Sequence, residues 1–315
     1  MSSRTVRTFT DPDQYAASIR GTEARLTVTG RGKFFASLAR IELRDLWMQR
    51  LSDNLPRITQ FSNFTNRAVF AFRTRPGPTV LLNGAELPSS AIAPVGAADS
   101  AVTRSRGDCS VSTMSLPVGT IASFAPAIAG RDLPSLHGAL ALTPQSLALT
   151  RLKHLHAAAI ALAEDAPVVL INPEAARGLE QALIEALVDS LGGGEVHEET
   201  AALRHHSAIM RRFHRTIEQH LGQPLYIPEL CVEIGASART LRVCCQEQLG
   251  MSPKRYLLVR RMHMARQALR ESSPRETTVT EIATRFGFWQ FGRFAGEYKT
   301  LFEETPSATL ARVVE

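Results

Sequence analysis

The sequence predicts an α+β protein of more than one domain: a β-rich N-terminal domain, a helical connecting region and an all-helical C-terminal domain. Three observations support this fold class. The 315 residues exceed the usual length of a single domain. Short apolar runs separated by Gly, Pro, Asn and Asp fill residues 24–116, and two similar helix–glycine–helix segments lie in the last third. We expect domain boundaries at 1–135, 136–200 and 201–315.

The N-terminal region is expected to open with a short helix at 10–20, capped by Thr10 or Asp11, with Pro12 in its first turn. A Pro-Gly-Pro turn and the hairpin signal Asn83-Gly84 punctuate the strand-like runs that follow. Many short strands at this spacing predict a small barrel or sandwich. The expected strands are 26–29, 34–43, 46–51, 57–61, 68–72, 79–82 and 110–116.

Two helices with N-terminal proline signals follow, one starting at Thr143-Pro144 and the other at Asn172-Pro173. Each carries a stripe at helical spacing, which either packs on the β-rich domain or pairs two chains, and the sequence favours neither reading. The stripes are Leu152, Leu155, Ala159 and Leu162, and Ala176, Leu179, Leu183, Leu187 and Ser190. The glycines at 192–194 are expected to end the second helix.

The net charge of +6 is confined to the C-terminal third. Residues 1–200 contain 19 Lys and Arg against 19 Asp and Glu, so the whole excess lies in residues 201–315. A basic surface suits a polyanion, although a merely solvated basic surface would give the same pattern.

The first helix pair, at 227–246, has the arrangement of a DNA-reading helix-turn-helix. Pro228 starts a short helix, Gly235 supplies a left-handed residue at its end and Ser237 caps the second helix. Arginine near the start of a recognition helix can pair bidentately with guanine in the major groove. An amphipathic helix with a solvated face would explain one such segment, but two in tandem favour DNA recognition. The expected contacts are Ala238, Arg239, Arg242 and Gln246.

The second pair, at 279–298, repeats this plan with Gly287 at its turn. Its apolar stripe includes Phe288 and Phe294, and Gly292 lets the backbone approach the groove wall. Trp289 either stacks on a sugar or a thymine methyl or lies in the core, and both readings stay open. The expected contacts are Trp289, Gln290, Gly292, Arg293 and Lys299.

A basic helix opened by Ser252-Pro253 and running to about Glu271 joins the two pairs. At ~1.5 Å per residue it is about 27 Å long, which with the packed pairs would place the recognition helices roughly one DNA turn apart, ~34 Å. The expected phosphate contacts, which position a protein without reading sequence, are Lys254, Arg260 and Arg261.

Two groups of residues in this third form a recognisable signature. The C-terminal group is Gly287-Phe288, Phe294, Tyr298-Lys299, Phe302 and Thr305-Pro-Ser307, and the central group is Gly250-Met-Ser-Pro253, Tyr256 and Arg261-Met262. With these motifs, residues 205–315 resemble the DNA-binding domain of the AraC/XylS family of bacterial transcriptional regulators, and residues 292–295 resemble its XylS branch. The sequence departs from the family at Glu303, usually glycine, at Cys245, often aromatic, and at Val243, often a polar DNA contact. Base preference therefore cannot be carried over.

The resemblance implies that residues 1–135 form a cupin-like β-barrel that binds a small organic effector, and that the protein is a homodimer that engages RNA polymerase. Segments 4–9, 30–34 and 114–117 resemble the sensor domain of XylS-type members. Arg57, Arg67 or Arg73 would fix an effector carboxylate. Aromatic residues would line the pocket, although most large apolar side chains are simply core. They are Phe34, Phe35, Trp47, Phe61, Phe64, Phe70 and Phe72.

A cupin-fold metalloenzyme is the alternative from another class. Such a metal site needs two or three histidines and a carboxylate inside the barrel, but the first histidine is His137, after the last expected strand. We therefore expect neither a metal, a cofactor nor catalysis. The four cysteines lack disulfide or zinc spacing. A redox role for Cys244-Cys245 competes with the usual reading of free cysteine as a small buried hydrophobe.

No apolar run approaches the ~18–20 residues that span a membrane, and no signal-peptide pattern opens the chain, so we expect a soluble cytoplasmic protein. The function expected is a sequence-specific regulator on double-stranded DNA, an effector-responsive activator of a nearby metabolic operon. The alternatives are a constitutive regulator whose barrel only dimerises and, with less support, a cupin-fold enzyme.

Overall fold

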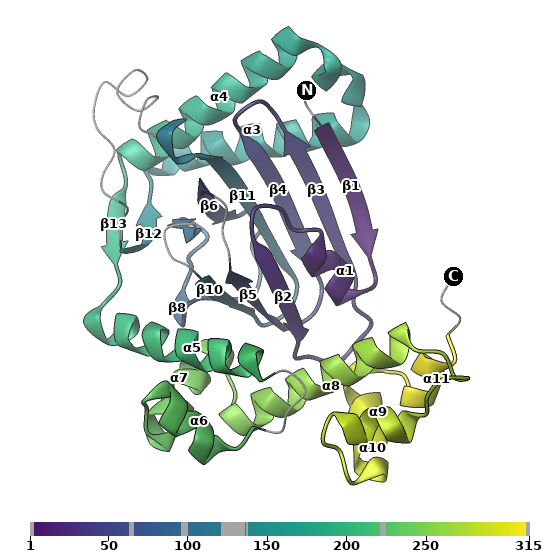
Figure 1. The fold of residues 1–315 in the computed structure, drawn as a ribbon. Helices are drawn as coiled ribbons and strands as arrows, with labels where there is room; N and C mark the ends of the chain where they lie inside the picture. The colour runs from purple at the N-terminus through teal and green to yellow at the C-terminus, as the bar shows by residue number, and fades with distance from the viewer. Residues whose placement is uncertain are drawn as a thin grey trace. The chain divides into compact units, whose positions relative to one another are not determined.

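The computed structural model divides the chain into two compact units, which are described separately (Figure 1). Unit 1 comprises residues 1–26, 34–54 and 59–200, and unit 2 comprises residues 27–33, 55–58 and 201–315. The structure describes residues 3–62, 66–95, 100–120, 136, 138–220 and 225–312. Phe64 and His137 lie outside the described residues.

The strands form two sheets. The larger is antiparallel throughout and follows the order β1 (Ser3–Phe9), β3 (Ala36–Glu42), β4 (Trp47–Asp53), β11 (Cys109–Pro117), β6 (Arg67–Arg73), β9 (Ile92–Pro94), β12 (Ala139–Thr143) and β13 (Glu195–Glu198). The smaller follows the order β2 (Glu23–Val28), β5 (Arg57–Ser62), β10 (Ser100–Ser105), β7 (Val80–Leu82) and β8 (Ala85–Glu86). Both orders are open in the described chain. The closed cupin-like barrel expected from the sequence is therefore not confirmed.

Each strand expected from the sequence has a counterpart in these sheets, but β1, β8, β9, β10, β12 and β13 were not anticipated. The two edge strands of the larger sheet explain part of this failure. Residues 3–9 contain only two apolar residues, Val6 and Phe9, and residues 195–198 carry two glutamates and a histidine. Their pairing partners, β3 and β12, lie far away in sequence, so local patterns give little signal for them.

Side-chain capping explains two of the helix starts in unit 1. The Asp11 carboxylate accepts a hydrogen bond of 2.8 Å from the backbone N–H of Gln14, which fixes the start of α1 (Pro12–Ala17). Asn172 caps α4 (Pro173–Gly192) in the same way, after a short 3-10 helix, η2 (Pro167–Ile171). The preceding helix, α3 (Ser146–Asp165), starts later than the Thr143-Pro144 expected, because residues up to 143 belong to β12.

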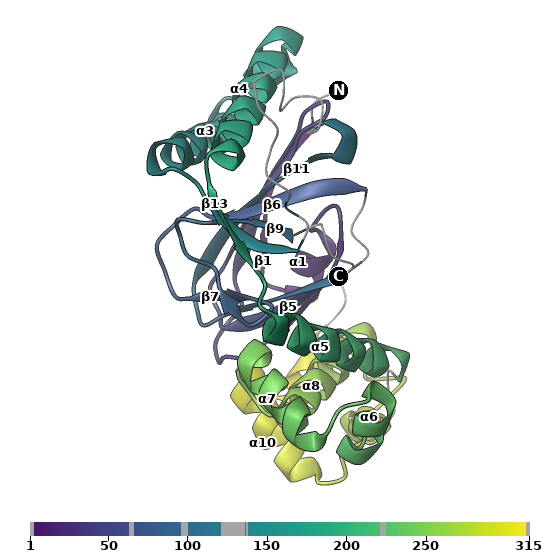
Figure 2. The same cartoon turned by 90° about the vertical axis from the view of Figure 1, so that its left-hand side faces the viewer.

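The main core of unit 1 lies between the larger sheet and helices α3 and α4, which cover one face of that sheet (Figures 1 and 2). Leu152 and Ala159 of α3 and Leu183 and Leu187 of α4 are buried in this core. The apolar stripes therefore pack within the chain, which answers the question left open by the sequence. Helices α3 and α4 also cluster with the sheets in unit 1.

The helical part of unit 2 has two short helix pairs on either side of one long helix. The pairs are α6–α7 and α9–α10, the long helix is α8, and α5 packs on α6 and α7. Their bounds are α5 (Ala201–Gln219), α6 (Ile227–Ile234), α7 (Ala238–Leu249), α8 (Pro253–Glu271), α9 (Val279–Arg285), α10 (Phe291–Phe302) and α11 (Pro306–Leu310). Ser252 caps the start of α8, and the helix begins at Pro253 and ends at Glu271, where the sequence predicts both ends. No helix of the described chain is long and apolar enough to cross a membrane.

Candidate nucleic-acid interface

The first helix pair leaves one face of its second helix open to solvent. Gly235 ends α6 with a φ of 63°, and the Ser237 hydroxyl accepts a 3.1 Å hydrogen bond from the Thr240 N–H at the start of α7. The residues expected to touch DNA are all exposed on α7, namely Ala238, Arg239, Arg242 and Gln246. On the opposite side Leu241 and Leu249 are buried, so α7 is fixed by its apolar face and presents its polar face outward.

The second pair has the same division between a buried and an exposed face. A capping box formed by Thr278 and Glu281 starts α9, and Gly287 makes the turn with a φ of 75°. Phe294 and Tyr298 are buried, whereas Trp289, at 74% exposure, lies outside the core. The expected DNA contacts on this pair are all exposed: Trp289, Gln290, Gly292, Arg293 and Lys299.

The arginines of the two exposed faces differ in their present partners. Arg293 donates a 2.9 Å hydrogen bond from Nε to Glu297, one turn further along α10. Such an exposed pair contributes little stability, so a base or phosphate can replace the glutamate at small cost. Arg239 and Arg242 form no ion pair within the described residues.

The three expected phosphate contacts on α8 fall into three different environments. Lys254 is exposed and Arg261 is half-buried. Arg260, by contrast, is only 4% exposed. A DNA phosphate cannot reach a side chain that is this deeply buried, so the phosphate contact expected for Arg260 does not fit the structure.

Phe291 belongs to the same exposed surface and was not expected there. It is the first residue of α10, stands between Gln290 and Gly292, and is 41% exposed. The helical period does not find it, because residues three apart lie on one face and 288, 291 and 294 would form a single apolar stripe. Helix α10 begins only at Phe291, so Phe288 lies in the turn before it and the period does not apply there.

Two of the three arginines expected to hold an effector carboxylate, Arg67 and Arg73, already bind backbone oxygens. Arg67 donates to the carbonyl oxygens of Asp45 and Ser115, the latter at 2.7 Å, and its guanidinium lies 3.8 Å from the centre of the Trp47 ring. Burial lowers the pKa of Arg67. Arg73 donates to the carbonyl oxygens that end the turn at 77–78, at 2.8 and 3.0 Å. Arg57 is buried, at 7% exposure.

The aromatic residues expected to line an effector pocket also have structural roles. Phe70 and Phe72 lie in the core between the larger sheet and α3, and Phe72 meets His156 edge-on at 5.3 Å between ring centres. Phe34 is buried against Tyr15 at 5.9 Å, while Phe35 is 53% exposed. These positions do not support the ligand contacts expected for Phe70 and Phe72.

The vicinal cysteines are unsuited to redox sensing. Cys244 and Cys245 are both buried, and burial raises the pKa of the Cys244 thiol to about 11 and that of Cys245 further. Because the thiolate is the reactive form, both thiols are inert at neutral pH. In the part of the chain that the structure describes, no cluster of three His, Cys, Asp or Glu residues could hold a metal ion.

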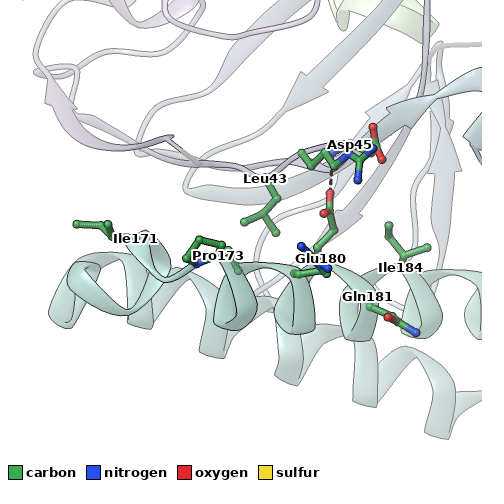
Figure 3. A pocket seen from close by; sticks show the side chains of 10 residues that line it. Leu43, Asp45, Ile171, Pro173, Glu180, Gln181 and Ile184 are labelled. Atoms are coloured by element: carbon green, nitrogen blue, oxygen red, sulfur yellow. Dashed lines mark hydrogen bonds between the residues drawn. The ribbon is translucent and has the colours of Figure 1, made fainter. Parts of the chain in front are cut away.

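A hollow of about 770 Å³ lies in unit 1 between α4 and the turn that joins β3 to β4 (Figure 3). Glu180 reaches across from α4, where its carboxylate accepts hydrogen bonds from the backbone N–H groups of Asp45 and Leu46 at 2.7 and 2.9 Å. Leu43 and Ile184 contribute apolar walls. At one end stands Ile171 of η2, which is 75% exposed.

The family model that matches this chain falls within the C-terminal unit. A family described as a helix-turn-helix domain matches residues 230–312. A probable thc operon regulatory protein of Rhodococcus erythropolis is 44% identical over 97 residues, which cover 31% of this chain and 29% of that protein. The XylDLEGF operon transcriptional activator 3 of Pseudomonas putida is 34% identical over 96 residues, covering 30% of this chain and 29% of that protein. The alignments thus span less than a third of either relative.

Among solved structures, ToxT from Vibrio cholerae O395 aligns over 93% of this chain and 98% of its own, at 11% identity and a TM-score of 0.29.

Proposed function

We infer that the C-terminal unit is the DNA-binding domain of an AraC/XylS-type transcriptional regulator. On this premise, we propose that the protein reads two successive major-groove segments of double-stranded DNA and regulates transcription of a neighbouring operon. The observation that carries the proposal is the pair of exposed recognition faces, on α7 and α10, each held in place by a buried apolar face on the same helix. Two relatives are by name operon regulators, one of them an activator, which favours activation of a metabolic operon.

Each recognition face has its own base-reading arginine. Arg239 and Arg242 stand within the first two turns of α7, and Arg293 stands in the first turn of α10. Side chains near the start of a recognition helix meet base edges in the major groove. Lys254, exposed on the connecting helix, would touch a phosphate, which would fix the protein on the duplex without reading sequence.

The test is selection of binding sites from random duplex DNA by the full-length protein, followed by footprinting of the selected sites. We expect a bipartite motif whose halves are about one helical turn apart. Arg239→Ala should relax the base preference of one half, and Arg293→Ala that of the other. Arg211→Ala, an exposed arginine on α5, is the control and should leave both halves unchanged. Protection without any recovered motif would refute sequence-specific reading.

The proposal includes a homodimer that engages RNA polymerase in the cytoplasm. The stripes of α3 and α4 are buried within the chain, so a dimer needs another apolar surface. Ile171 of η2, 75% exposed at the hollow of Figure 3, and Val168 of the same short helix, 70% exposed, are the apolar residues that we propose for it. A second copy of this chain is the occupant we propose for it, because exposed contiguous apolar residues mark association sites.

Control by a small effector has an alternative, a regulator that responds to no ligand in its N-terminal unit. Arg67 and Arg73 already bind backbone carbonyl oxygens, so part of each guanidinium is engaged within the chain. This favours, as a second candidate, a regulator whose N-terminal unit serves only in association. Equilibrium dialysis of the full-length protein against labelled extracts of small metabolites separates the two: retention of a metabolite supports effector control, and its absence supports the second candidate.

A further inference from the structure

A second hollow, of about 690 Å³, lies wholly within unit 2, along α8. One wall is the start of α6, around Tyr226 and Pro228, and the opposite wall is the turn from α9 to α10, with Phe286 and Gly287. The side of α8 forms the floor. The hollow therefore lies between the two helix pairs, and its volume is in the range of small-molecule sites, roughly 300–1,000 Å³.

Arg260 contributes a buried cation to this hollow. It is 4% exposed, and among the described residues its buried Nη1 has no hydrogen-bond partner. A buried donor without an acceptor is costly, and more so when it carries charge. The protein thus holds a buried charged donor for which the described chain supplies no acceptor.

Arg261 stands beside it and is positioned by the second turn. Its guanidinium lies 5.2 Å from the centre of the Phe288 ring, and a Cβ at residue 287 would stand 3.2 Å from its Nη1. Gly287 thus serves two purposes, a left-handed backbone and room for this side chain. The buried Nε of Arg261 also has no partner within the described residues. Burial lowers the pKa of Arg261, but an arginine remains charged.

The rest of the lining is mainly apolar, although the exposed cations Lys254 and Arg285 also belong to it. Leu257 and Met264 of α8 and Ile217 of α5 line the hollow, and two exposed rings, Tyr226 and Trp289, stand among its walls. A phosphodiester strand is too bulky to reach a side chain that is 4% exposed, and its sugars and phosphates gain nothing from apolar walls. A small anion with an apolar body satisfies both the cations and the walls.

We propose that this hollow binds a small carboxylate with an apolar body, its carboxylate on the guanidinium groups of Arg260 and Arg261 and its body against Leu257 and Met264. Arginine suits this role because its planar guanidinium pairs with both oxygens of a carboxylate. An occupant would touch α6, α8 and the α9–α10 turn together. It would therefore fix the position of one helix pair relative to the other, and with it the affinity for DNA. Only this regulatory consequence rests on the proposed function.

The binding test uses the full-length protein without DNA. The probes are 4-phenylbutyrate and octanoate, with 4-phenylbutanol and octanol as uncharged controls of similar shape, titrated by calorimetry. We expect at least one carboxylate to bind saturably and at least tenfold more tightly than its alcohol. Arg260→Gln should weaken that binding at least tenfold while leaving the melting temperature unchanged or higher, because it removes an unpaired buried charge. Arg255→Gln makes the same charge change on the exposed side of α8, outside the hollow, and should bind as the parent does.

Two further variants keep the test decisive if Arg260→Gln fails to fold. Arg260→Lys retains the charge and should retain part of the affinity, whereas Leu257→Trp fills the hollow and should abolish binding. The proposal is overturned if neither carboxylate binds, if the alcohols bind equally well, or if Leu257→Trp binds as the parent does. If Arg260 binds a DNA phosphate instead of a carboxylate, neither probe will bind, and the salt dependence of DNA binding will be shallower in Arg260→Gln than in the parent.

The regulatory consequence is tested apart from the site. DNA affinity is measured by mobility shift with and without a saturating probe, and we expect a change of at least threefold. Unchanged DNA affinity with intact probe binding removes the regulatory role and leaves the site. Probe binding by a protein that binds no DNA motif refutes the proposed function but supports the site.

Discussion

Side-chain placement on α7 separates base reading from general attraction to DNA. Arg239 is exposed and forms no ion pair in the described part of the chain, so its substitution removes no ion pair there. Arg239→Ala should therefore cost about 1–3 kcal/mol on the selected site and much less on scrambled DNA. Lys254→Ala should weaken binding to both DNAs equally and lower the salt dependence. Fluorescence anisotropy at several salt concentrations measures this, and equal losses for Arg239→Ala on both DNAs would contradict a base-reading role.

His156 couples the core of unit 1 to pH. Burial, with a smaller contribution from Arg50, lowers its pKa from 6.5 to about 3. In the unfolded chain the imidazole of this residue is protonated near pH 6.5, whereas in the folded protein it stays neutral until about pH 3. Its contribution to the free energy of unfolding is therefore fully present above pH 6.5 and is lost as the pH falls towards 3. On this scale the protein loses about 2 kcal/mol between pH 8 and pH 5 from this residue. His156→Leu should flatten the pH dependence of urea denaturation over that window, and parallel curves for variant and parent would contradict it.

Helix ends in unit 2 contain one position where the chain is strained. Glu303 ends α10 with a φ of 57°, a left-handed backbone that Cβ disfavours. Glu303→Gly should therefore raise the free energy of unfolding by about 1 kcal/mol, less any entropy that glycine adds to the unfolded chain.

Two matched variants isolate the backbone effect at Glu303. Glu303→Ala keeps the left-handed strain and should not stabilise the protein. Gly250→Ala, at the end of α7 with a φ of 71°, should lower the free energy of unfolding by a similar amount. Chemical denaturation measures all three, and equal stabilities of the Gly and Ala variants at 303 would mean that side-chain loss, not φ, decides.

Elements fixed by neighbouring residues could be predicted, whereas elements fixed by distant partners could not. Asn172, Ser237 and Ser252 cap their helices within three residues, so α4, α7 and α8 begin where the sequence indicates. Strand β13 depends on β12, more than fifty residues earlier, and was missed. The burial of Arg260 was missed for the same reason, because the sequence of α8 is basic on several sides and only the packing of two helix pairs decides which arginine is enclosed.

For the whole molecule, the exposed η2 surface leads to a prediction about association. Ile171→Asp should shift the protein towards monomers in sedimentation velocity and lower its apparent affinity for a two-site DNA, because a charge in an apolar contact is costly. Val118→Asp is the control: it introduces the same charge at an exposed apolar residue of unit 1, 54% exposed, outside η2, and should leave association unchanged. A dimer that persists in Ile171→Asp would show that the two copies meet elsewhere.

The connecting helix also limits how a binding site for this protein can change over time. α8 is a single uninterrupted helix of 19 residues, capped at Ser252, so the helix pairs at its ends cannot easily rotate about the DNA axis independently. Each base pair inserted between two half-sites turns one half by about 34° relative to the other and moves it along the axis. A regulator joined by a disordered linker would tolerate such insertions. For this protein a single inserted base pair should harm binding more than a single substitution within either half-site, so operators should diverge by base replacement at constant spacing.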